Sequence, residues 1–269
     1  MKHLSIILAF LVTLSSPVAS QDFDKGMAAY KAGDHATAMR EWKPLAGSGD
    51  IKAQYNLGVM FEHGQGVPQD YKEAIKWYRL AADQAHVGAQ NNIGTMFQNG
   101  KGVDQDYKSA VKWFLLAAQQ GRASSQHNLG FLYQTGQGVS VDYDQAIKFY
   151  LLAAHQEYVH AQYNLGALYH IGQGVLQDYK EAIKWYRLAT VQGHAKAQYN
   201  FGLMYLNGEG VIQDNVFAHL WWNISAANGD ADALGNRDIL AKSMTSEDIS
   251  KAQAMARECM SSGYTKCGE

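Results

Sequence analysis

The sequence has few prolines, few cysteines and no marked excess of either charge. Three prolines among 269 residues, against 26 glycines, argue against domains joined by proline-rich linkers and indicate many helix and turn endings. A formal net charge of −2 excludes a strongly basic, polyanion-binding protein and a strongly acidic one, so no nucleic-acid partner is expected. With 47% hydrophobic residues the chain can bury a substantial core, which argues against disorder.

Long apolar runs are also scarce, and the run that opens the chain, from Leu4 to Leu14, is too short to cross a bilayer of about 30 Å. A lysine precedes this run, and Pro17 and small residues up to Ser20 follow it. This order is typical of a secretory signal peptide over residues 1–20, with cleavage after Ser20. No cysteine directly follows the run, so a lipoprotein is not indicated. We therefore predict an exported protein, periplasmic or secreted, without a transmembrane anchor in the mature chain.

The two cysteines, Cys259 and Cys267, both lie near the C-terminus. In an exported protein the favoured interpretation is an intramolecular disulfide that ties down the tail. Two free thiols, or a disulfide to another chain, are the alternatives.

The main positive feature is an internal repeat of 36 residues. Residues 64–82 and 172–190 are nearly the same phrase, GQGVPQDYKEAIKWYRLAA and GQGVLQDYKEAIKWYRLAT, three periods apart. Glycine, asparagine, aspartate and aromatic residues recur at this step in five consecutive units without insertions. The glycines of one such series are Gly58, Gly94, Gly130, Gly166 and Gly202.

Each unit is predicted to contain two helices. In the first unit, apolar residues at helical spacing run from Ala53 to His63, and the helix ends at the glycines of GQG. Asp70 then supplies an N-cap oxygen for a second amphipathic helix, with Glu73 in capping-box position. A unit of this size cannot bury its apolar face alone, so the units must stack. Asn56 and its equivalents repeat so strictly that we expect them to bond a neighbouring backbone.

The pattern A-x3-LG-x2-aromatic-x2-G-x-GV-x2-D-x3-A-x2-W-aromatic-x2-AA resembles the Sel1-like repeat (Sel-one-like repeat) family, relatives of the tetratricopeptide repeats. The resemblance implies an all-α, right-handed α-solenoid that works in protein–protein interaction, as an adaptor, an envelope regulator or a host-interaction factor. Residues 21–51 are interpreted as a degenerate N-terminal unit, 52–231 as five repeats, and 232–269 as C-terminal capping helices. No catalysis and no cofactor are expected.

Enzymatic alternatives find little support in the motifs. The GQGV loops lack both the GxGxxG fingerprint and the GK[ST] of a P-loop, so they are interpreted as helix endings. Ser109 and Lys112 match the SxxK string of penicillin-recognising enzymes, and some relatives of the repeat family have been linked to beta-lactam binding or hydrolysis. However, no SDN or KTG partner accompanies them. Beta-lactam hydrolysis is kept as the alternative function.

A metal site is also considered, because the chain contains ten histidines. His127, His160 and His170 lie in adjacent units, but none belongs to an HExxH motif, and the cysteine spacing does not fit a zinc knuckle. We interpret these histidines as surface or groove residues.

A binding groove remains as the candidate site. By resemblance to tetratricopeptide arrays, the first helices line the concave face, and the framework repeats while two rows of residues on these helices vary. Aromatic residues in such rows suit protein or peptide recognition. The predicted groove residues are Tyr55, Asn91, His127, Phe131, Tyr163, Tyr199 and Leu203.

Overall fold

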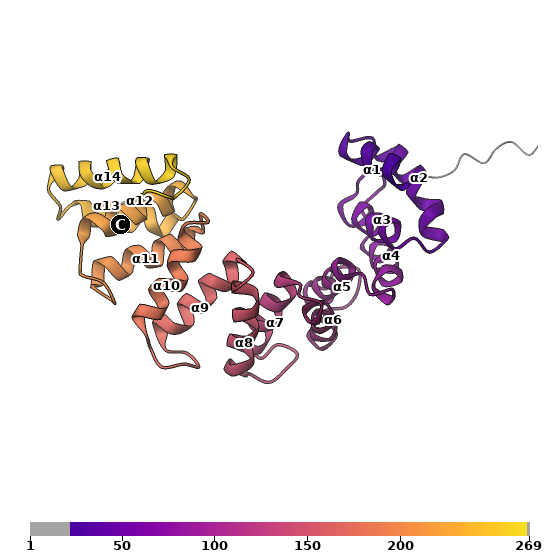
Figure 1. The fold of residues 1–269 in the computed structure, drawn as a ribbon, viewed down its shortest axis with the longest axis horizontal. Coiled ribbons are helices and arrows are strands. Elements are labelled where there is room, and N and C mark those ends of the chain that lie inside the picture. The colour runs from indigo at the N-terminus through magenta and orange to yellow at the C-terminus, as the bar shows by residue number, and fades with distance from the viewer. Residues whose placement is uncertain (1–21, 268–269) are drawn as a thin grey trace, which may run out of the picture. The chain divides into compact units, whose positions relative to one another are not determined.

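The computed structural model describes residues 22–267, which form fourteen α-helices and no strand (Figure 1). This confirms the predicted fold class, an all-α solenoid of helix pairs. The predicted signal peptide lies outside the described residues. Among the described helices, none combines the length and apolarity needed to span a bilayer.

The chain divides into two compact units, with the boundary between Leu80 and Ala81, inside the fourth helix. The described helices of the first unit are α1 (Phe23–Lys31), α2 (His35–Gly47), α3 (Ile51–His63) and most of α4 (Tyr71–Asp83). Those of the second unit are α5 (Val87–Asn99), α6 (Tyr107–Gln119), α7 (Ala123–Thr135), α8 (Tyr143–Ala154), α9 (Val159–Ile171), α10 (Tyr179–Thr190), α11 (Ala195–Asn207), α12 (Asn215–Ala227), α13 (Ala231–Ala241) and α14 (Ser246–Ser261).

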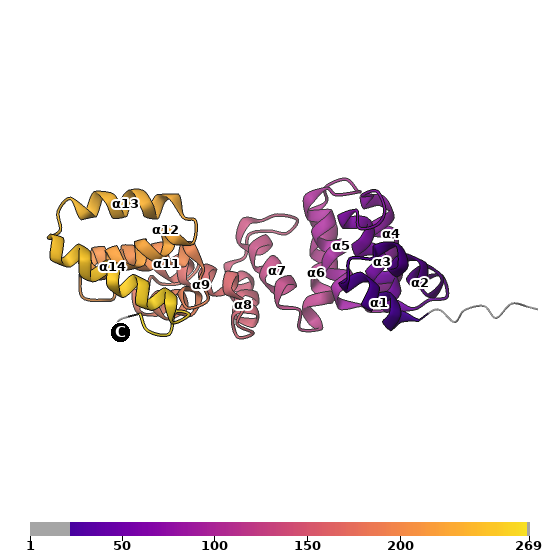
Figure 2. The same ribbon diagram turned by 90° about the horizontal axis from the view of Figure 1, so that it is seen from above.

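Helices within a repeat pack closely because a glycine on the first helix faces an aromatic ring on the second. A Cβ at Gly166 would lie 2.5 Å from Cδ1 of Tyr186, and a Cβ at Gly130 would lie 2.6 Å from Cδ1 of Tyr150. Both tyrosines are fully buried. In the second unit, consecutive helices from α5 to α12 pack against one another, as Figures 1 and 2 show. The repeated glycines therefore set the distance between paired helices.

The two glycines of each GQG loop have different tasks. The first, such as Gly172 with φ of 69°, adopts the left-handed conformation that ends the preceding helix. The second, such as Gly174, also has a positive φ, of 75°, and a Cβ there would lie 2.2 Å from Cβ of Tyr143 in the preceding repeat. The loop is thus a helix ending, as predicted, and also an inter-repeat contact.

The predicted aspartate caps are confirmed, but the capping box is incomplete. Oδ1 of Asp178 accepts hydrogen bonds from the backbone N–H groups of Lys180 and Glu181, at 2.9 and 3.1 Å. The Glu181 side chain does not return to the Asp178 N–H, because that N–H already donates to the Tyr169 carbonyl at 3.0 Å. Glu181 instead forms an ion pair with Lys184.

A series of buried glutamines, absent from the predictions made from the sequence, joins successive repeats. Nε2 of Gln162, near the start of α9, donates to the Ala154 carbonyl at the end of the preceding repeat, at 3.3 Å. Its Oε1 accepts from Nε2 of Gln192, at 2.7 Å. The same two bonds recur at Gln126. The glutamines thus satisfy backbone carbonyls that the ends of the second helices would leave without partners.

The asparagine series does not bond the backbone as expected. Nδ2 of Asn200 donates to the Tyr186 hydroxyl at 3.0 Å, and Nδ2 of Asn164 lies 3.1 Å from Nε2 of His127. Both partners are side chains of the preceding repeat. The expectation is wrong at these two positions because glutamines two residues earlier already bond the neighbouring backbone.

The first helix pair keeps the repeat's internal packing although its loop is shorter. A Cβ at Gly26 would lie 2.4 Å from Nε1 of Trp42, and that indole N–H donates to the Phe23 carbonyl at 3.2 Å. In the last repeat, Trp222 likewise faces Gly202 and donates to the Tyr199 carbonyl at 3.1 Å.

At the other end of the chain, α13 and α14 both pack against α12.

Candidate functional site

A hollow of about 470 Å³ opens on three successive repeats of the second unit. We call it the histidine hollow. Its lining comes from α7, α9 and the start of α11, and consists of His127, Phe131, His160, Tyr163, Asn164, His194, Ala195 and Lys196.

Three of the lining residues, Phe131, His160 and Lys196, are exposed. Phe131 keeps 38% of its surface in solvent. Behind them, the Tyr163 ring stacks on His194 with 4.7 Å between ring centroids. The hollow therefore presents an aromatic, largely apolar surface with a few polar groups, the composition expected of a binding site.

The hydrogen bonds of His194 and His160 fix where each ring carries its proton. Nδ1 of His194 accepts the Ala197 backbone N–H at 3.2 Å and so caps the start of α11. A neutral His194 must then be protonated at Nε2, which lies 3.3 Å from Nδ1 of His160. His194 therefore donates to His160, and the remaining proton of a neutral His160 is at its own Nε2.

His127 is held in the other tautomer. Its Nε2 lies 3.1 Å from the donating Nδ2 of Asn164, so the proton is on Nδ1, which lies 3.3 Å from Oδ1 of Asn128. Its ring also contacts Tyr150 and Tyr158, with centroids 5.7 and 5.2 Å away. Both nitrogens of His127 are thus satisfied within the protein.

Burial keeps His127 and His194 neutral at pH 7. It lowers the pKa of His127 from 6.5 to about 4, against a smaller opposing effect of the Asn128 hydrogen bond. Burial also lowers the pKa of His194 to about 4, and the neighbouring His160 and Lys196 act in the same direction. At neutral pH, His127 and His194 are therefore uncharged.

Charge around the hollow is unevenly distributed. Helices α5, α7, α9 and α11 contain no aspartate or glutamate. Lys196 is the charged residue in the lining, and Arg122 lies just before α7 with its Nε donating to Ser124 at 3.1 Å. Glu157 and Asp230 lie in neighbouring loops, outside the lining. The pKa of Tyr163 is raised mainly by burial, and the charge of Asp230 raises it further.

The structure brings together three of the seven predicted groove residues, namely His127, Phe131 and Tyr163. Tyr55 belongs to the first unit, where its ring packs on Tyr78 with 5.7 Å between centroids. Oδ1 of Asn91 accepts from two serine hydroxyls of the next repeat, at 3.0 and 2.9 Å, so this side chain is committed to packing between repeats.

Tyr199 and Leu203 lie under the C-terminal helices instead. The Tyr199 hydroxyl accepts a hydrogen bond from Nδ2 of Asn236 on α13, at 2.8 Å. Tyr199 and Leu203 both pack against a cluster that includes Trp222 and Leu240. Their position on the helix matches that of Tyr163 and Ala167, but they pack against residues of α13. The structure therefore places these two predicted groove residues beside α13 and not in the hollow.

The prediction also missed His194, Lys196 and Asn164. His194 precedes its helix and Lys196 lies in the first turn, so neither belongs to the two variable rows on the first helices. The position of His194, just before the first helix of each unit, also varies between units: it is His86, Arg122, Tyr158 and His194 in successive copies. This variation could have indicated that it belongs to the site.

The SxxK string forms a helix cap. Oγ of Ser109 donates to Oδ2 of Asp106 at 2.6 Å, and the Ser109 N–H donates to Oδ1 of the same residue. Lys112 is exposed on α6. The serine hydroxyl is therefore directed at a capping carboxylate, as a helix N-terminus requires.

Histidines do not assemble into a metal centre within residues 22–267, where no group of three or more His, Cys, Asp or Glu side chains has suitable geometry. The three histidines considered from the sequence separate: His127 and His160 lie at the hollow, whereas Nε2 of His170 lies 2.8 Å from a carboxylate oxygen of Glu209.

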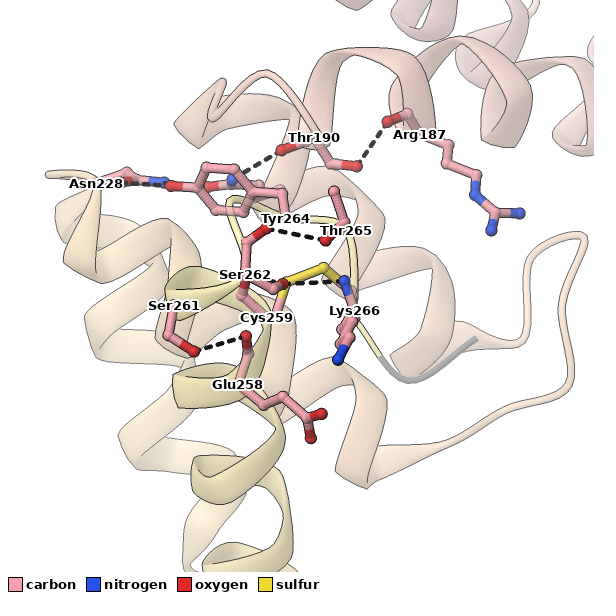
Figure 3. The surroundings of a disulfide bond; sticks show 12 residues. Arg187, Thr190, Asn228, Glu258, Cys259, Ser261, Ser262, Tyr264, Thr265 and Lys266 are labelled. Carbon is pink, nitrogen blue, oxygen red and sulfur yellow. Dashed lines mark hydrogen bonds between the residues drawn. A yellow bond between two sulfur atoms is a disulfide. The ribbon is translucent and has the colours of Figure 1, made fainter.

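The C-terminal end carries a disulfide between buried Cys259, in α14, and Cys267 (Figure 3). The loop between them places the Tyr264 hydroxyl within hydrogen-bonding distance of the Asn228 side chain, 3.0 Å from Nδ2. A second hollow, of about 500 Å³, lies between this loop, Trp221 and the end of α10. The disulfide thus closes a loop that packs on α12.

Comparison with known proteins places these features in a family. The family model described as Sel1 repeat matches five successive segments, residues 51–86, 87–121, 123–158, 159–194 and 195–230.

Two solved structures share the fold with substantial sequence identity. The chain is similar to c5321, a protective antigen present in uropathogenic Escherichia coli strains, with 33% identity, a TM-score of 0.78 and coverage of 90% of this chain. It spans only 53% of c5321. A Sel1 repeat protein from Oxalobacter formigenes is 32% identical with a TM-score of 0.76, over 88% of this chain and 100% of that protein.

A curated mouse protein, DAP3-binding cell death enhancer 1, is 44% identical over 45 residues, which are 17% of this chain and 9% of that protein. The five matched segments cover most of the chain, and the fold agrees with two Sel1-type structures. The chain is thus a helical scaffold consistent with protein–protein interaction, and it belongs to the Sel1 repeat family.

Proposed function

We propose that this protein is an exported scaffold that binds an extended segment of a partner protein in the histidine hollow. The observation that carries the proposal is an exposed aromatic surface on an otherwise uniform framework. Phe131 remains 38% exposed, while the framework residues of the same helix, such as Leu129 and Leu132, are fully buried. An exposed phenylalanine beside a tyrosine and polar donors is the composition of a recognition surface.

Export is the second part of the proposal. It is supported by the leader-like first twenty residues and by the disulfide between Cys259 and Cys267, since disulfides persist in oxidising compartments. The similarity to c5321, a protective antigen, agrees with export. Fractionation of cells that express the full chain tests it. Retention of the protein in the cytosol, with residues 1–20 still attached, would contradict export.

The binding proposal is tested by site-specific photocrosslinking in the native compartment, with benzoylphenylalanine in place of Phe131. We expect one discrete adduct, because the side chain at 131 lines the hollow. The same photoreactive residue at Leu176, a loop position that is 91% exposed, is the control and should not give that adduct.

A pair of double variants then separates the hollow from general stickiness. Phe131→Ala with Tyr163→Ala should abolish capture of the crosslinked partner. Leu176→Ala with Ile212→Ala removes apolar surface from loops outside the hollow and should leave capture intact. Circular dichroism checks that both variants stay folded. Equal capture by the two folded variants would refute binding at the hollow.

A further inference from the structure

We propose that the partner segment is acidic: it places an aspartate or glutamate side chain against His160 and Lys196, and an adjacent aromatic side chain on Phe131 and Tyr163. This inference rests on the proposed function and adds the chemistry of the partner.

The first argument is the direction of the hydrogen bonds. Nδ1 of His160 accepts from His194, which leaves the Nε2–H of His160 as a donor without a partner in the described part of the chain. His160 is exposed and lines the hollow. Lys196, the other exposed polar residue of the lining, carries three donors and no acceptor. Two donors call for an acceptor on the ligand.

The second argument is charge. Lys196 is the charged residue of the lining, and the helices that carry the hollow have no acidic residue. Burial holds His127 and His194 neutral at pH 7, so the positive charge that an anion would meet in the hollow comes from Lys196. A carboxylate that accepts from His160 and Lys196 would make charge-assisted hydrogen bonds, which are stronger than neutral ones. A basic side chain in the same place would be repelled by the Lys196 ammonium group.

The third argument concerns the shape of the ligand. The hollow of about 470 Å³ is open and lies across three helices, so it accommodates a chain that passes through it. Phe131 and the stacked pair of Tyr163 and His194 offer aromatic faces beside the donors. An aromatic side chain next to the carboxylate would gain contact area there at little entropic cost. We therefore commit to an internal acidic side chain with an aromatic neighbour.

The test uses four acetylated and amidated peptides with the full-length protein, and isothermal titration calorimetry as the readout. GSDFDFSG is the acidic aromatic peptide, GSNFNFSG removes its charge at constant shape, GSDSDSSG removes its rings, and GSKFKFSG reverses its charge. We expect the first to bind at least about tenfold more tightly than each of the others. Raising the salt concentration should weaken its binding.

Matched protein variants locate the effect. Lys196→Met should reduce the affinity for GSDFDFSG to about that of GSNFNFSG. Lys148→Met, at an exposed position on α8, should leave it unchanged. Lys196→Glu should reverse the preference in favour of GSKFKFSG. Circular dichroism confirms folding of each variant.

Three results would overturn the inference: equal affinity for GSDFDFSG and GSNFNFSG, equal weakening by the two methionine variants, or no binding of any peptide. None of them decides the proposed function, because crosslinking at position 131 reports partner capture whatever the charge of the partner. Loss of that crosslink would remove both.

Discussion

The neutrality of buried His127 predicts acid sensitivity of the repeats around the hollow. The folded protein takes up a proton on His127 only near pH 4, whereas the unfolded chain does so at the ordinary pKa of 6.5. Between these values the unfolded state binds more protons, so its share grows as the pH falls. Stability from this residue is therefore complete above pH 6.5 and declines down to about pH 4.

The size of the effect follows from the two pKa values. At about 1.36 kcal/mol per pH unit, the interval from 6.5 to about 4 corresponds to roughly 3 kcal/mol of unfolding free energy. His160, Tyr150 and Tyr158 face the ring from the neighbouring helices, and none is an acid that would favour the imidazolium at these pH values. Among residues 22–267, no carboxylate therefore offsets the cost of burying the charged ring.

The assay compares wild type with His127→Asn, since asparagine occupies the equivalent position 91. Urea unfolding at pH 7 and pH 4 should show a loss about 3 kcal/mol smaller for the variant. Because helical repeats can unfold in parts, hydrogen exchange of α7 and α9 is measured alongside. His63→Asn, at an exposed histidine, controls for the substitution itself. An unchanged pH dependence in His127→Asn would refute the reasoning.

Three further outcomes are expected. Gly166→Ala should destabilise the protein by about 1–3 kcal/mol in urea unfolding, since the new Cβ would meet the Tyr186 ring; an unchanged midpoint would contradict this. Ser109→Ala should lower the free energy of unfolding by about 1 kcal/mol through its lost bond to Asp106. Wild type and this variant should both show only background turnover of nitrocefin, whereas turnover by wild type that the variant abolishes would establish hydrolysis. Reducing the disulfide, whose cysteines are eight residues apart, should remove about 2.5 kcal/mol and speed hydrogen exchange at the end of α14; equal exchange before and after reduction would count against it.

The stacking framework was predictable because its determinants are local and recur in every copy. The glycines that end helices, the aspartates that begin them and the small residue at Gly166 are all legible in the 36-residue pattern. The incomplete capping box could not be read in this way. Glu181 pairs with Lys184 because the Asp178 N–H already donates to the Tyr169 carbonyl, at the other end of the loop.

The candidate site was harder to predict because which residues line it depends on what packs against each repeat. Position 199 is equivalent to 163, yet Tyr199 is tied to α13 while Tyr163 lines the hollow. Nothing in the periodic pattern says where α13 and α14 pack against the repeats. The histidine hydrogen bond likewise joins residues 34 positions apart in different repeats, His160 and His194. Such sites follow from the packing of neighbours rather than from any single copy.

The glutamine series has a consequence for the length of the chain. Each buried glutamine of the second unit reaches back 8 residues to a carbonyl and is reached by a side chain 30 residues ahead, as Gln126 and Gln162 both show. Because these offsets are the same in each copy, a whole unit could be duplicated or deleted and every remaining junction would find its bonds. A gain or loss of a few residues would not be tolerated in this way. The scaffold is therefore built to change its size in whole modules, and each added module would bring a new set of exposed positions for recognition.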